Sequence, residues 1–144
     1  MRTDIKMRLI IDNLPLIVVL LLFLFLFIAL FVPRYNDYFN LNKQMVKLRE
    51  NGFLADYIIE SNKVNIVFND AFHEIAFVFP NKIKFYSYND IITYRWHWVE
   101  SNGMKLDNYI HFQLRDKNRP IIKILLFNAN YAEYWMAKLD AIFS

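Results

Sequence analysis

Residues 16–32 read LIVVLLLFLFLFIALFV, a run of seventeen side chains without a charge, a polar group, a glycine or a proline. A helix over this run spans about 26 Å, and its flanking residues extend it towards the roughly 30 Å hydrocarbon thickness of a bilayer. A cleaved secretory signal has a shorter apolar core followed by small residues, whereas Ala29 is the only small residue of this run. The stretch predicts a transmembrane helix over residues 14–33, preceded by an N-terminal tail of residues 1–13.

The two ends of the predicted span carry recognisable helix signals. Asn13 is a suitable N-cap, and Pro33 is expected to end or kink the helix. Arg34 and Tyr35 follow at once, as is typical where a helix leaves the hydrocarbon and reaches the lipid headgroups. We therefore expect a single-pass protein of the cell (inner) membrane, with the lipid bilayer as its first partner.

Charge does not settle the orientation of this anchor. Basic residues precede it at three positions and follow it at four: Arg2, Lys6 and Arg8, then Arg34, Lys43, Lys47 and Arg49. The positive-inside rule compares such counts, and three against four leaves both orientations open, with the cytoplasmic side preferred for the domain.

The composition of the rest of the chain excludes some function classes. Residues 56–144 hold ten Lys or Arg and ten Asp or Glu, so this part is neutral and lacks the concentrated basic face that nucleic-acid binding requires. There is no cysteine, so no disulfide can form. The sequence has no nucleophile elbow, no phosphate-binding glycine loop and no HExxH motif, which predicts a protein that is not an enzyme and that uses no cofactor.

Residues 34–52 predict an amphipathic helix beside the membrane. Tyr38, Leu41, Met45 and Leu48 recur at steps of three and four, with polar and basic residues between them, and Asn51 and Gly52 form a C-cap signal. The apolar stripe is expected to pack against the following domain or to lie along the headgroups. A short coiled coil that joins two copies of the chain is the alternative.

From residue 53 the apolar pattern changes from a helical to an alternating period, which predicts one domain over residues 53–144. The predicted strands are 57–60, 64–69, 74–79, 83–86, 91–99, 109–115 and 121–127, with turn-prone Asn, Asp, Gly and Pro residues between them. An amphipathic helix over 129–143 follows, with Trp135, Leu139 and Ile142 on its apolar face. The fold class is α+β.

Seven short strands followed by a helix with a central tryptophan resemble the PH-like domains of bacteria, members of the pleckstrin-homology superfold. The resemblance rests on VNIVFNDAFHEIAFVF (64–79), FYSYNDIITYRWHWVE (85–100), NYIHFQLRDKNRPIIKILLF (108–127) and NANYAEYWMAKLDAIF (128–143). It implies a seven-stranded antiparallel barrel or sandwich of two roughly orthogonal sheets, closed at one end by the C-terminal helix. Because this superfold includes lipid binders, peptide binders and scaffolds, it does not fix the function.

Two groups of residues are candidate binding sites. Tyr94, Trp96 and Trp98 alternate along one strand and so share a face, which is either core packing or a groove for an apolar partner. Basic residues gather in one later turn, where they are either a solvated hairpin tip or a contact for lipid headgroups: Arg115, Lys117 and Arg119. His97 and His111 lie on neighbouring predicted strands, but two histidines without further ligands do not predict a metal site.

These features predict a non-catalytic membrane protein whose domain is a protein-binding or scaffold module. One alternative is a membrane-resident immunity or phage-exclusion factor, for which the small size and single anchor are equally suitable. A second alternative is a sensor of anionic lipid that uses the basic turn.

Overall fold

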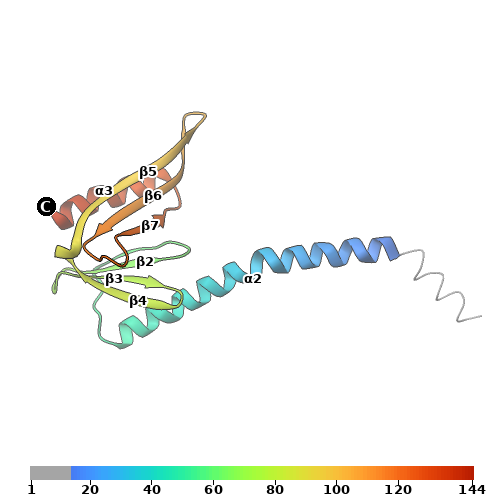
Figure 1. Ribbon diagram of the computed structural model, residues 1–144, viewed down its shortest axis with the longest axis horizontal. Helices are drawn as coiled ribbons and strands as arrows, with labels where there is room; N and C mark the ends of the chain where they lie inside the picture. Colours follow the sequence, from blue (N-terminus) through green and yellow to red (C-terminus); the bar gives the residue numbers. More distant parts are fainter. Residues whose placement is uncertain (1–13) are drawn as a thin grey trace, which may run out of the picture. The chain divides into compact units, whose positions relative to one another are not determined.

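The computed structural model describes residues 14–144, so the predicted tail and the Asn13 cap lie outside the described residues. The first element is helix α2, Leu14–Glu50, shown in blue to cyan in Figure 1. Within the described part of the chain, α2 is the one helix that is long and apolar enough to cross a membrane, with a mean hydropathy of 3.3 in its most apolar window. This agrees with the predicted apolar helix near the start of the chain.

Helix α2 does not end at Pro33, as the sequence allowed, but continues to Glu50. A proline within a helix removes one main-chain hydrogen bond and favours a kink, but the flanking turns retain their own bonds. The two predicted segments, 14–33 and 34–52, therefore share one helix. The chain nevertheless divides into two compact units at this point, 1–36 and 37–144, so the last part of α2 belongs to the same unit as the strands.

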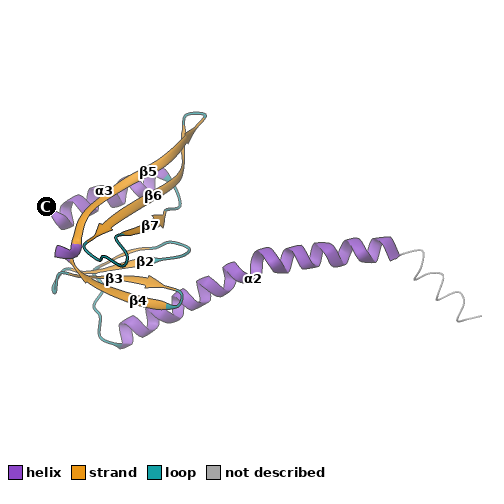
Figure 2. Ribbon diagram, viewed as in Figure 1, coloured by secondary structure: helices purple, strands orange, loops and turns teal. Residues whose placement is uncertain are grey.

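The second unit is an α+β domain of seven strands and a C-terminal helix (Figure 2). One antiparallel sheet, called sheet A, is formed in the order β1 (Tyr57–Ile59), β2 (Asn65–Asn69), β3 (Glu74–Phe79) and β4 (Lys82–Ser87). The short helix η1 (Tyr88–Asp90) leads to a second antiparallel sheet, sheet B, in the order β5 (Ile91–Ser101), β6 (Met104–Leu114) and β7 (Ile121–Leu125). Helix α3 (Ala129–Phe143) ends the fold.

The seven antiparallel strands and the C-terminal helix confirm the predicted α+β class, but the strands do not close into a barrel. They form two sheets, because η1 carries the chain out of sheet A before β5 begins. The β5–β6 hairpin is also longer than predicted, since pairing extends to Ser101 and Met104. Asn102 and Gly103, with φ of 51° and 75°, form a two-residue turn that matches the twist of paired strands.

The main core lies between the inner faces of the two sheets and α3. Phe68 and Phe77 from sheet A face Phe112 from sheet B, and all three side chains are fully buried. Helix α3 adds Trp135 and Leu139, and the Trp135 ring stacks on Phe68 with centroids 6.3 Å apart. The predicted apolar face of the last helix therefore fills the space between the sheets.

The last turns of α2 cover the outer face of sheet A. Leu41, Met45 and Leu48 are buried against a second apolar cluster on the strands, formed by Val67, Ala76 and Val78. Strand β2 is buried on both of its faces for this reason. The structure therefore shows the amphipathic segment packed against the domain. Its apolar stripe is covered by sheet A.

Candidate functional site

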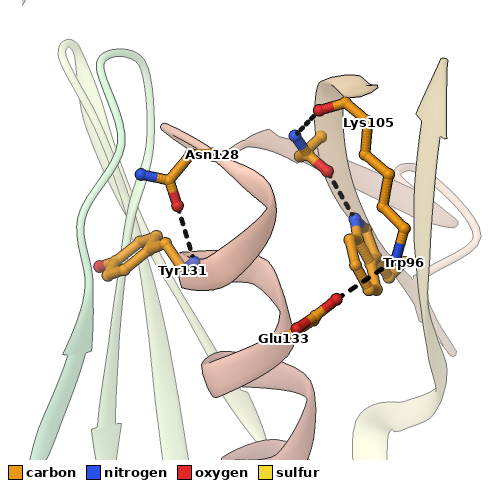
Figure 3. A network of polar contacts seen from close by, with 6 residues as sticks. Trp96, Lys105, Asn128, Tyr131 and Glu133 are labelled. Carbon is orange, nitrogen blue, oxygen red and sulfur yellow. Dashed lines mark hydrogen bonds and ion pairs between the residues drawn. The ribbon is translucent and has the colours of Figure 1, made fainter. Parts of the chain in front are cut away.

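Two of the three site residues that were predicted on strand β5 pack against the core of the domain. Tyr94 and Trp96 are half-buried against the main core, and the Tyr94 hydroxyl donates to Asp140 of α3 over 2.7 Å. The Trp96 Nε1–H donates to the Asn108 side-chain oxygen at 3.1 Å (Figure 3). Trp98 is 42% exposed and lies beside Trp96, with ring centroids 4.7 Å apart. Tyr94 and Trp96 therefore pack against the core, whereas Trp98 is exposed.

Lys105 covers these two tryptophans from the neighbouring strand. Its Nζ lies 4.3 Å from the Trp96 ring centroid and pairs with Glu133 of α3 at 3.2 Å (Figure 3). The same Nζ lies 4.7 Å from the ring centroid of Trp98. A lysine held over indole rings is favourable through the ring quadrupole. This contact braces the long hairpin against the helix.

The three basic residues of the β6–β7 turn do not form one patch. Arg119 lies over the Phe79 ring, with Cζ 4.7 Å from the centroid, whereas Arg115 and Lys117 are exposed. Between them, Asp116 accepts from the Tyr86 hydroxyl at 2.8 Å, and this hydrogen bond is the main reason that the pKa of Asp116 is lowered. The turn is therefore docked onto sheet A.

A large concave surface runs beside α3, and we call it the α3 groove. It consists of two cavities of about 700 and 730 Å³ that share His73, Tyr88 and Ile142 in their walls. The first cavity lies between α3 and the loops of sheet A, and the second lies between α3 and the start of β5. The second brings together Tyr94 and Arg115, one residue from each of the two groups that the sequence indicated.

The acidic side chains of the α3 groove are both engaged by tyrosine hydroxyls. Tyr88 donates to Asp70 over 2.5 Å, and burial followed by this hydrogen bond raises the pKa of Tyr88 well above its ordinary value. Burial and then the Asp140 hydrogen bond raise the pKa of Tyr94 to about 12. Both tyrosines therefore stay protonated near neutral pH and act as ties between elements.

Sequence analysis missed the first cavity because its residues come from turns and from distant elements. His73 has a φ of 52°, and its carbonyl accepts from the Tyr88 N–H at 2.8 Å, which positions both residues in the wall. Lys138 lies over the Tyr57 ring, 3.8 Å from the centroid, and joins α3 to β1. No spacing pattern in the sequence marks such a wall. Among residues 14–144, no group of three or more His, Cys, Asp or Glu is placed to hold a metal ion.

Strand β5 borders the second cavity and is an edge strand of sheet B, paired only with β6 among the described strands. In an antiparallel pair, alternate residues direct their N–H and C=O groups away from the partner strand. The free edge therefore offers main-chain hydrogen-bonding groups next to the groove. Comparison of the chain with protein families, curated proteins and solved structures finds no match.

Proposed function

We propose that this chain is a non-catalytic, membrane-anchored binding module of PH-like fold that holds an extended segment of a partner protein in the α3 groove. The observation that carries the proposal is the cavity of about 730 Å³ between the free edge of β5 and helix α3. An extended peptide that adds to a sheet edge gains main-chain hydrogen bonds from the strand and specificity from neighbouring side-chain pockets. The edge of β5 supplies the main-chain hydrogen-bonding groups, and helix α3 forms the other wall of the side-chain pocket.

The walls of the second cavity favour a partner segment with an acidic side chain. Arg115 is exposed at one end of this cavity, whereas Asp140 is already bonded to Tyr94. Met136 and Phe143 of α3 supply apolar surface between them. A guanidinium with an unused planar donor fork binds a carboxylate in two parallel hydrogen bonds, so we assign to Arg115 the recognition of an acidic residue.

The membrane part of the proposal rests on the apolar half of α2, and the PH-like part rests on the order of the elements. An uncharged run in a helix of this length is suited to cross a bilayer. Two antiparallel sheets of four and three strands, with Trp135 of the last helix between them, support the PH-like assignment. The proposal of a role without catalysis rests on the sequence, which has no nucleophile elbow, phosphate-binding glycine loop or HExxH motif.

Site-specific photo-crosslinking in cells tests the groove. Ile92 is 52% exposed and lies in the wall of the second cavity, so a photoreactive residue at this position should form a crosslink to a protein segment. Leu54, which is 65% exposed and lies outside the groove walls, is the control position. Mass spectrometry of the product should identify an extended segment with an acidic residue.

A charge-reversal pair makes this experiment specific. Arg115→Glu should abolish the crosslink from position 92, whereas Lys117→Glu, an equal charge change in the same turn but outside the groove, should leave it unchanged. Crosslinks that form equally from Leu54, or that survive Arg115→Glu, would refute the groove as the binding site.

A further inference from the structure

The outer face of sheet B carries a row of basic side chains across all three strands. Arg95 of β5 is paired with His111 of β6, and His111 is paired with Lys123 of β7. These residues alternate with Tyr94, Phe112 and Ile122, whose side chains face the main core, so they share the opposite face. His111 therefore lies between two permanent cations, Arg95 on one side and Lys123 on the other.

A second histidine lies next to this row. His97 lies two residues after Arg95 on β5, and its ring centroid is 4.4 Å from that of His111, with the rings tilted by 33°. The pKa of His111 is lowered below its ordinary value, first by burial and then by the electrostatic effects of His97 and Lys123. The His111 Nε2 atom is buried and has no hydrogen-bond partner among the described residues. A buried polar nitrogen without a partner is costly and points to a missing ligand.

The histidine pair lies in the wall of a cavity of about 190 Å³ on this face. The other wall residues add a guanidinium, a hydroxyl, an amide and one apolar side chain: Arg95, Thr93, Gln113 and Ile121. Lys123 stands beside them with its Nζ over the Tyr109 ring, 3.9 Å from the centroid. Four side chains in the cavity wall can donate hydrogen bonds from nitrogen, and the threonine can donate one from oxygen.

The charges of this face decide between a metal ion and an anion. Residues 91–99, 109–114 and 121–125, which form most of sheet B, contain no Asp or Glu. Two imidazoles without a carboxylate give too few ligands for zinc, and the adjacent Arg95 and Lys123 repel a cation. An anion, in contrast, is attracted by Arg95 and Lys123 and accepts hydrogen bonds from the donors of the cavity wall.

We propose that the cavity on the outer face of sheet B binds a phosphoryl group, held by Arg95, His97 and His111. A phosphoryl oxyanion has enough oxygens to engage the guanidinium fork and both imidazoles at once. The group comes from a small phosphorylated molecule or from a phospholipid headgroup, which share this chemistry. The site adjoins the α3 groove at Thr93, but Arg95, His97 and His111 do not line the groove, so the proposal does not depend on the partner that the groove binds.

Histidine NMR of the full chain in uncharged detergent micelles tests the site with inorganic phosphate as the probe. The chain has three histidines, and His73 lies in the α3 groove, so it is an internal control. Phosphate should shift the His97 and His111 resonances with saturation and raise the lowered pKa of His111, because the bound anion stabilises its protonated form. Chloride at the same ionic strength should not, and His73 should not respond.

Matched substitutions and a lipid arm complete the test. Arg95→Gln should weaken phosphate binding by at least about tenfold, the loss expected for one charge-assisted hydrogen bond, whereas Lys117→Gln should leave it unchanged. Phosphatidylcholine vesicles with phosphatidic acid, but not without it, should compete with phosphate if the source is a headgroup; absence of competition assigns a soluble phosphorylated molecule. Equal shifts of all three histidines, or normal binding by the Arg95→Gln variant, would overturn the proposal.

Discussion

The packing of α2 on sheet A can be tested by truncating one buried leucine. Leu48 is 1% exposed and contacts the apolar cluster on the outer face of sheet A. Leu48→Ala removes three carbon groups, worth about 2.4 kcal/mol at about 0.8 kcal/mol each, and the remaining cavity raises the expected loss of unfolding free energy to about 2–5 kcal/mol. Val46 is 53% exposed on the same helix, so Val46→Ala should change stability by no more than about 0.5 kcal/mol.

Urea denaturation of the full chain in detergent micelles, followed by tryptophan fluorescence, measures this loss. All three tryptophans, at positions 96, 98 and 135, lie in the strands and in α3, so the signal reports on the domain and not on α2 itself. At a urea m-value of about 2 kcal/mol/M, the Leu48→Ala midpoint should fall by about 1–2.5 M. If Leu48→Ala and Val46→Ala unfold at the same urea concentration, the end of α2 is not part of the domain core and the reasoning fails.

Three further predictions concern the polar ties and the orientation of the chain. Asn108→Ala should lower the unfolding free energy by about 1–3 kcal/mol in the same assay, because the Trp96 N–H and the Lys105 carbonyl lose their partner. The pKa of Tyr94 is raised from about 10 to about 12, so the stability from its Asp140 hydrogen bond should be complete below pH 10 and be lost as the pH rises through 12. Ultraviolet titration should show this late ionisation, and Tyr94→Phe should remove it from the stability curve, whereas a Tyr94 that ionises near pH 10 would contradict the geometry. A reporter fused at Ser144 should be active in the cytoplasm; activity only outside the cell would instead favour an immunity or exclusion factor.

Local patterns in the sequence were sufficient for the elements of the fold. Seventeen uncharged residues in succession predict the apolar helix, and side-chain alternation predicts the seven strands, because both signals depend only on neighbouring residues. The face alternation of β5 also indicated that Tyr94 and Trp96 share one side. Their hydrogen bonds to Asp140 and Asn108 could not be predicted, since each joins residues from different elements.

Tertiary structure decided which faces are covered and which side chains meet. The apolar stripe around Leu41 and Leu48 was expected to face the domain or the headgroups, with a second copy as the alternative, and only the position of sheet A selected the domain. The α3 groove and the pairing of Arg95 with His111 likewise depend on strand register and on where α3 docks. A sequence pattern states which face of an element is apolar, but it does not state what lies opposite, because that depends on contacts between residues far apart in the chain.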